Sequence, residues 1–200
     1  MLRFDHLAIA CTDLDSGADW LTARLGTRPQ SGGAHDFMAT HNRLLRLGPG
    51  EYLELIAIDP DAPPPSRPRW FGLDGFDGPP RAAGWVLRSD DLDHERPPDH
   101  PVPQPARRGD LRWRITIPDS GQMPMQGLVP MLIEWAAGSR HPADNLPDAG
   151  LRLTAMKLTH PDPAALARAL PPFDDARLML AQGAPGLHFH IQTPTGDAWL

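Results

Sequence analysis

Two strand-like runs near the N-terminus carry the most informative pattern of hydrophobic and polar positions. Residues 3–10 are hydrophobic at most positions, and the alternation of a strand places His6 on the same face as Phe4. Residues 52–58 are hydrophobic apart from Glu54. Strands that are hydrophobic on both faces are typical of a fully covered sheet, so both polar side chains are predicted to be buried. A buried carboxylate needs a partner, which makes this pair a candidate site.

The segment between these two runs predicts one helix followed by strands. Hydrophobic residues recur at three- and four-residue spacing over 14–25, with Thr12 or Asp13 as the N-cap and Gly26 at the end of the helix. A weak strand or loop is expected before a clear strand over 43–47. The first unit therefore runs strand, helix, weak strand or loop, and two strands.

Later parts of the chain repeat this order. A strand-helix-strand-strand pattern is expected three times: in a first module over 1–60, in a second, helix-poor module over 82–138 and in a third unit over 149–200, with a proline-rich connector over 61–81. Prolines prevent regular structure where the second module should have its helix. Internal repetition of this length indicates a fold assembled from related units.

Composition and charge exclude several classes of function. The formal net charge of −6 and a single lysine, Lys157, provide no basic surface for nucleic acid. A single cysteine, Cys11, allows no disulfide within the chain. No hydrophobic run approaches the roughly 20 residues needed to span a bilayer, and no signal-peptide pattern opens the sequence. We therefore expect a cytoplasmic protein that binds neither nucleic acid nor membrane.

The first sixty residues resemble a known family. The run Asp5-His6-Leu7-Ala8-Ile9-Ala10, followed by Asp13-Leu14 and by residues 40–48 and 52–60, is similar to a glyoxalase-like domain of the vicinal oxygen chelate superfamily. The resemblance implies an α+β fold of paired βαβββ modules, whose curled mixed sheets enclose a cleft. It also implies that pairs of modules can close across a dimer interface, so a homodimer is expected.

The resemblance implies a metal site whose ligands come from the first and last strands of each module. In the first module these are His6 and Glu54. In the second module the matching positions are Gly84, which cannot bind a metal, and Glu134. The expected metal ligands are therefore His6, Glu54 and Glu134. If the third unit is the partner instead, the matching positions are Ala155 and either His188 or His190, although these two histidines are expected to face solvent.

Four residues are candidates for binding the substrate. His41 and Asn42 lie beside a predicted loop over the cleft, where His35 is a further candidate. Trp113 and Arg114 alternate on a later strand and can supply an aromatic wall and an anion contact. The competing interpretation is that loop histidines and strand arginines lie on an ordinary exposed surface.

Two functions of different classes follow. The first is a metal-dependent lyase, isomerase or dioxygenase, in which Zn, Mn, Fe or Ni binds two adjacent oxygens of a small substrate and Glu134 moves the proton as the catalytic residue. The second is a metal-free binding protein, similar to antibiotic-sequestering members of the superfamily, that holds an organic molecule through Trp113, Trp85 and Phe37. Fold alone does not decide between them.

Overall fold

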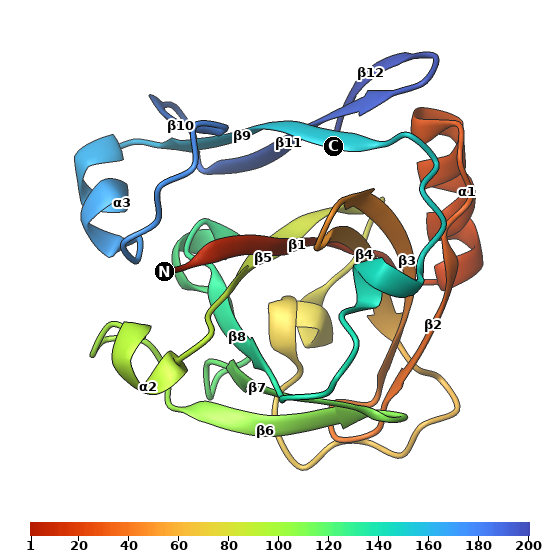
Figure 1. The fold of residues 1–200 in the computed structure, drawn as a ribbon, viewed down its shortest axis with the longest axis horizontal. Helices are drawn as coiled ribbons and strands as arrows, with labels where there is room; N and C mark the ends of the chain where they lie inside the picture. Colours follow the sequence, from red (N-terminus) through yellow and green to blue (C-terminus); the bar gives the residue numbers. More distant parts are fainter.

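Two packed sheets form the protein, and the computed structural model describes all of residues 1–200. The larger sheet has eight strands and is curled, and a four-stranded sheet packs on its outer face (Figure 1). None of the helices combines the length and the hydrophobicity needed to cross a membrane.

The eight-stranded sheet is built by two modules that each run strand, helix and three strands. The first module contains β1 (Arg3–Ala10), α1 (Leu14–Leu25), β2 (Gln30–His35), β3 (Thr40–Gly48) and β4 (Glu51–Ile58). The second contains β5 (Arg81–Arg88), α2 (Leu92–Glu95), β6 (Pro103–Arg108), β7 (Leu111–Thr116) and β8 (Met131–Trp135). The helix of the second module is a single turn, as its prolines predict.

The strand order β2-β3-β4-β1-β5-β8-β7-β6 places the modules side by side, joined where β1 and β5 run antiparallel. In this pairing Ala8 lies opposite Gly84, and His6 lies opposite Val86. A two-fold rotation that exchanges the modules therefore exchanges these two residue pairs. His6 and Gly84 thus take equivalent places in the two modules, as do Ala8 and Val86. The sheet curls until its edge strands β2 and β6 contact each other. The predicted α+β fold of paired βαβββ modules around a cleft is confirmed.

Helix α1 begins and ends where the sequence predicts. The Asp13 side chain accepts a hydrogen bond of 2.8 Å from the backbone N–H of Ser16, and Gly26 closes the helix at φ +69°. The helix buries Leu14, Leu21 and other hydrophobic residues of one face against the sheet. Burying one leucine contributes about 1.5–3 kcal/mol, so tertiary packing stabilises this helix more than its intrinsic propensity does.

A β-bulge in β1 changes the predicted assignment of side chains to faces. The pairing with β5 shifts register between Phe4 and His6. Phe4 therefore packs in the core between the two sheets, whereas Ala8 and Ala10 face the inside of the curl. The prediction that Phe4 shares a face with His6 is wrong, because the extra residue reverses the alternation.

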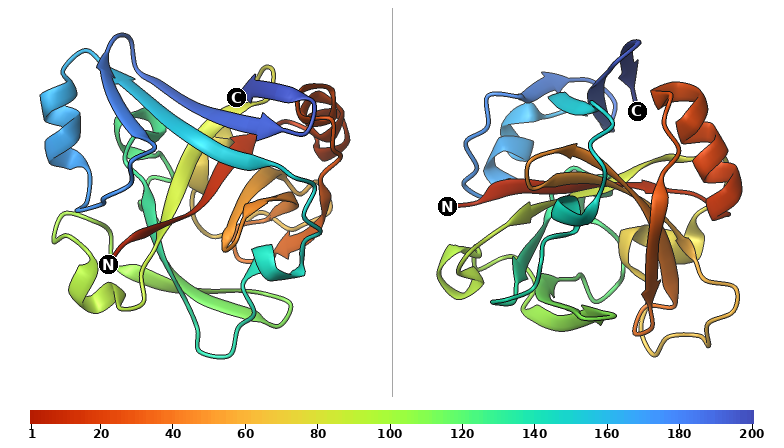
Figure 2. Two further views of the ribbon diagram at one scale, coloured as in Figure 1. Left: turned by 45° about the horizontal axis from the view of Figure 1, so that its top comes forward. Right: turned by 45° about the vertical axis from the view of Figure 1, so that its right-hand side comes forward.

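The C-terminal unit has a different topology from the two modules. It contains β9 (Arg152–His160), α3 (Pro163–Ala169), β10 (Leu178–Gln182), β11 (Gly186–Thr193) and β12 (Gly196–Trp199) in the order β10-β9-β11-β12. It lies across the outside of the curled sheet, as two further views show (Figure 2). Leu158 and Phe189 pack there in one core with Leu7 and Leu55. The second module, and not this unit, therefore completes the cleft.

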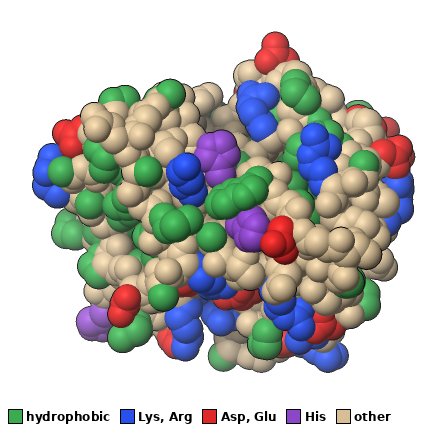
Figure 3. All heavy atoms as spheres, turned by 90° about the horizontal axis from the view of Figure 1, so that it is seen from above, with side chains coloured by type: hydrophobic (Ala, Val, Ile, Leu, Met, Phe, Trp, Pro, Cys, Tyr) green, Lys and Arg blue, Asp and Glu red, His purple; other side chains and the backbone are tan.

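The outer face of the C-terminal sheet is turned to solvent. His188 is exposed and His190 half-buried, and they alternate with buried Leu187 and Phe189. Histidine side chains appear at the surface when the molecule is viewed from this side (Figure 3). This agrees with the expectation that these two histidines face solvent.

The inside of the curl is filled by the connector between the modules. Its short 3-10 helix η1 (Trp70–Gly75) buries Trp70, Phe71 and Leu73 against the concave face of the sheet. Of two further 3-10 turns, η2 (Pro124–Gly127) packs against β5, and η3 (Pro142–Asn145) packs against β3 and β4 of the first module. The connector is thus a packed part of the cleft wall.

Candidate functional site

The buried polar residues of the chain are concentrated in one place. Ten polar side chains are buried, and seven of them form one connected cluster: Asp5, His6, His35, Thr40, Asn42, Glu54 and His141. Removing polar groups from water costs free energy unless each finds a partner, so such clusters are uncommon in a core and typical of functional sites. Six of the seven come from the first module.

Asp5 is the fixed centre of one end of this cluster. Its carboxylate accepts hydrogen bonds from His6 Nδ1 at 2.7 Å, from His141 Nε2 at 3.0 Å and from Trp135 Nε1 at 3.0 Å. Burial alone would raise the pKa of Asp5, but the hydrogen bonds from His141 and His6 outweigh it and hold this pKa well below its usual value. Asp5 is therefore a carboxylate at any physiological pH.

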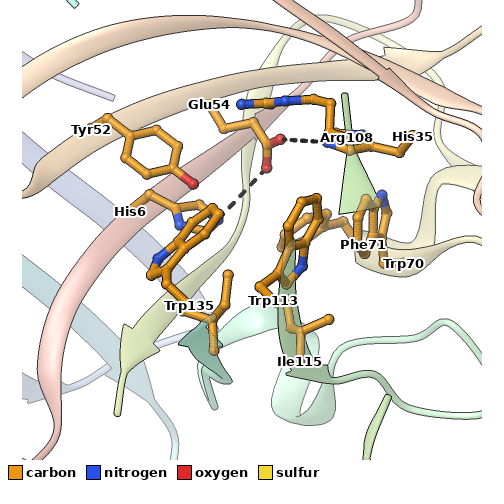
Figure 4. Close-up of a pocket in the computed structure, with 11 residues that line it drawn as sticks. His6, His35, Tyr52, Glu54, Trp70, Phe71, Arg108, Trp113, Ile115 and Trp135 are labelled. Carbon is orange, nitrogen blue, oxygen red and sulfur yellow. Dashed lines mark ion pairs between the residues drawn. The ribbon is translucent and has the colours of Figure 1, made fainter. Parts of the chain in front are cut away.

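The contact with Asp5 sets the tautomer of His6. Because an ionised carboxylate can only accept, His6 Nδ1 carries a proton, and Nε2 of the neutral ring keeps its lone pair. Nε2 lies 3.7 Å from Glu54 Oε2, and the ring stacks on Tyr52 at 4.5 Å between centroids (Figure 4). The bulge in β1 makes this geometry, because it turns both Asp5 and His6 out of the outer core.

Glu54 is oriented from its other side by Asn42. The Asn42 amide oxygen accepts a hydrogen bond from the backbone N–H of Gly33 at 3.0 Å, so its Nδ2 faces Glu54 Oε1 and donates to it at 2.5 Å. One carboxylate oxygen is thereby engaged, while Oε2 faces His6. The predicted partner of this buried carboxylate is therefore a pair, Asn42 and His6.

His35 closes the far end of the cluster. Its Nδ1 lies 3.1 Å from Thr40 Oγ1, and its Nε2 lies 3.4 Å from Asn42 Nδ2 and 3.9 Å from Glu54 Oε1. Burial lowers the pKa of His35 well below 6.5, and the positive charge of Arg108 lowers it further. His35 is thus a neutral, fully buried ring at neutral pH.

A small cavity separates the polar residues of the first module from an aromatic wall. Its lining residues are His6, His35, Tyr52, Glu54, Trp70, Phe71, Arg108, Trp113, Ile115, Ile133 and Trp135 (Figure 4). The free volume is about 20 Å³, room for roughly one water molecule. Burial, with the negative charges of Asp5 and Glu54, raises the pKa of Tyr52 well above 10, so its hydroxyl is a neutral donor.

The structure brings some of the predicted site residues together and separates others. His6, Glu54 and Trp113 line the cavity. Asn42 lies behind them and donates a hydrogen bond to Glu54. His41 is only half-buried, does not line the cavity and alternates with Asn42 along β3.

Glu134 and Arg114 lie on the opposite face of the sheet and contact each other instead. Arg114 Nη2 donates to both oxygens of Glu134, at 3.0 and 2.9 Å, and Glu134 also accepts from the backbone N–H of Leu92 at the start of α2. This contact stabilises the short helix and its strand. Glu134 is therefore absent from the site that the repeat alignment assigned to it.

Strand register shows why the repeat alignment misplaced Glu134. The parallel pairing of β1 with β4 puts Ala8 opposite Glu54, and the pairing of β5 with β8 puts Val86 opposite Met131. Because Ala8 and Val86 are equivalent, Met131 takes the place of Glu54 in the second module. Glu134 follows Met131 by three positions, an odd offset in a strand, so its side chain points to the opposite face.

Several residues of the site were not predicted from the sequence. Asp5 precedes His6 directly, and adjacent residues of a regular strand face opposite sides, so nothing indicated that they would meet. His141 and Trp135 reach Asp5 from 136 and 130 residues away in the chain. Arg108 lies in the proline-rich segment that the sequence left without regular structure.

The donor set does not amount to a metal centre. No group of three or more His, Cys, Asp or Glu side chains is placed to hold a metal ion. Two donors face the cavity, His6 Nε2 and Glu54 Oε2, while His35 is engaged by Thr40 and Asn42. The second module contributes a glycine and a methionine at the equivalent positions. Two protein donors do not fit a resident divalent ion of the expected kind.

The sequence and the structure were each compared with known proteins. The sequence matches the family model described as a glyoxalase-like domain over residues 4–173. A hypothetical protein from Staphylococcus aureus superposes with a TM-score of 0.57 at 12% identity, covering 100% of this chain and 84% of that one. Its similarity supports the fold. No curated protein matches the sequence.

Methylmalonyl-CoA epimerases are also among the similar structures. The enzyme from Mycobacterium tuberculosis gives a TM-score of 0.45 at 22% identity, over 66% of this chain and 85% of that one. An epimerase in complex with methylmalonyl-CoA and NH4+ gives 0.44 at 16% identity, over 70% and 98%. Since the family model covers most of the sequence, this chain belongs to the glyoxalase-like domain family.

Proposed function

We propose that this protein is an enzyme of the isomerase or lyase type that moves a proton on a small carbonyl compound, with His6 as the base. The observation that carries this proposal is the orientation of His6. Asp5 holds its Nδ1–H at 2.7 Å, so the Nε2 lone pair faces the cavity. A histidine positioned in this way by a carboxylate is a common general base.

The surrounding groups suit the two charges that proton transfer creates. When His6 Nε2 takes a proton from a carbon next to a carbonyl, the electron pair of the C–H bond moves toward the carbonyl oxygen and forms an enolate. The imidazolium then lies between the carboxylates of Asp5 and Glu54, which stabilise it. The Tyr52 hydroxyl, a neutral donor beside His6, can hydrogen-bond to the enolate oxygen. Return of the proton to carbon completes the cycle.

The binding-protein alternative has less support from the geometry. Of the three aromatic residues expected to hold a ligand, only Trp113 lines the cavity. Trp85 is buried between the two sheets, where its N–H donates to the Leu128 carbonyl, and Phe37 packs edge-on against Trp70.

Hydrogen–deuterium exchange tests the proposal directly. The protein is incubated in D2O with a panel of small oxo compounds, charged and neutral, and deuterium at carbon is followed by proton NMR. We expect exchange with the native protein and a loss of roughly 100-fold or more in His6→Gln, the usual contribution of a general base. The exposed His188→Gln variant is the matched control. Absence of exchange across the panel, or an equal rate in folded His6→Gln, would refute the proposal.

A further inference from the structure

Arg108 lies at the boundary between the buried cavity and a much larger outer cleft. The cleft has a volume of about 770 Å³ and is lined by residues of β2, of the β6–β7 turn and of the segment around η3. Arg108 lines both spaces and is the one residue that they share. Arg108 therefore stands between the outer cleft and the cavity that His6 lines.

The approach of the two edge strands gives Arg108 this position. It is the last residue of β6, and its side chain crosses Gly33 of β2. A Cβ at residue 33 would lie 3.1 Å from Arg108 Cδ and 3.2 Å from its Cγ, closer than ordinary packing allows. The absent side chain of Gly33 therefore leaves the passage for the arginine, which extends toward the side of the cavity where Glu54 and His35 lie (Figure 4).

The charge of Arg108 has no counterpart within the protein. Half-buried Arg177 is paired with Glu51 and Asp175, whereas half-buried Arg88, which lines neither space, also makes no ion pair. The guanidinium of Arg108 makes no ion pair or hydrogen bond, and no other lysine or arginine lines either space. Its charge still reaches the interior, since it contributes to the lowered pKa of His35. A half-buried, unpaired guanidinium is ready to bind an anion.

We propose that Arg108 binds the carboxylate of the substrate, and that the substrate is a short 2-oxo acid that enters through the outer cleft. This inference rests on the proposed function, because the oxo group provides the carbon acid for His6. Two parallel N–H groups of a guanidinium match the two oxygens of a carboxylate. The small inner volume requires the carbonyl to lie close to the carboxylate, so only a few atoms pass beyond Arg108.

Pyruvate and its neutral analogue pyruvamide provide the test. They share the carbonyl and the methyl group and differ in charge. Binding is measured by calorimetry to the native protein, to Arg108→Met and to Arg107→Met, a neighbouring exposed arginine that serves as the matched control. Urea unfolding checks that each variant is folded.

We expect pyruvate to bind the native protein and Arg107→Met equally, and to bind Arg108→Met at least tenfold more weakly. Pyruvamide should bind weakly to all three proteins. The inference is overturned if pyruvate does not bind the native protein, if Arg108→Met binds it normally, or if pyruvamide binds as tightly as pyruvate.

Exchange of the pyruvate methyl protons in D2O separates this inference from the proposed function. Binding that depends on Arg108 without any exchange would support the carboxylate site and refute proton transfer by His6. Exchange that depends on His6 but is equal in Arg108→Met would support proton transfer and refute the role of Arg108.

Discussion

The two modules of the curled sheet share one topology and differ in what they place at its centre. In the first module the equivalent positions hold His6 and Glu54, and in the second they hold Gly84 and Met131. The first module supplies the polar side of the cavity, and the second supplies its wall of Trp113, Trp135 and isoleucines. The His6 and Glu54 pair therefore has no counterpart in the second module, because backbone pairing constrains where side chains point and leaves their chemistry free.

The largest expected effect compares the two glutamates. Glu54→Gln removes the carboxylate beside His6, and we expect proton exchange to fall by about 100-fold, since the imidazolium loses one of its two stabilising charges. Glu134→Gln should leave the exchange rate unchanged and lower the free energy of unfolding by about 1 kcal/mol through its partly exposed contact with Arg114. Equal rate losses in both variants would contradict the one-sided site.

Asp5→Asn should show how firmly the first module depends on its buried charge. An amide cannot accept from His6, His141 and Trp135 together, so at least one buried donor loses its partner. We expect the free energy of unfolding to fall by about 3 kcal/mol in urea titrations. Asp90→Asn, which breaks an exposed ion pair with Arg3, is the control and should change little. A neutral effect of Asp5→Asn would show that this carboxylate does not hold the site.

Stability should depend on pH through His35. Its pKa is lowered in the folded protein, so the folded state resists a proton that the unfolded state takes up below about pH 6.5. The stabilisation is complete above that pH and decreases as the pH falls, by at most about 1.4 kcal/mol per unit for one proton. His100, whose pKa burial also lowers, contributes in the same direction. Urea unfolding at pH 7.5 and 5.5 measures the difference.

The variant His35→Gln tests the assignment of this pH dependence. It should reduce the stability difference between pH 7.5 and 5.5 relative to the native protein, because one of the protons taken up on unfolding is lost. An unchanged difference would mean that another group is responsible.

The smallest expected effect is that of metal removal. Because two donors face the cavity and the second module adds none, dialysis against a chelator should change proton exchange by less than about twofold. Metal analysis of the purified protein checks this independently. A stoichiometric divalent metal that disappears in His6→Ala would contradict the donor set seen here, and would show that ligands rearrange around an ion.

The sequence by itself determined the elements of the first module, and its resemblance to a known family implied the class of fold. The spacing of Leu14, Ala18, Leu21 and Leu25 and the caps Asp13 and Gly26 define α1, and the alternation along β4 places Glu54 on the inner face. These features depend on neighbours within a few residues, so local physical rules are sufficient to predict them. The buried pair His6 and Glu54 was found in the same way.

Tertiary structure alone decided what surrounds that pair. Pairing between distant strands produces the bulge that turns Asp5 and His6 inward and the register that puts Met131 in place of Glu134. The contact of the edge strands β2 and β6, where Arg108 crosses Gly33, also depends on strands that are distant in the sequence. A shift of one residue reverses the face of every side chain in a strand, and no local pattern records it. For that reason the sequence indicates where the site begins, and the folded sheet decides which residues complete it.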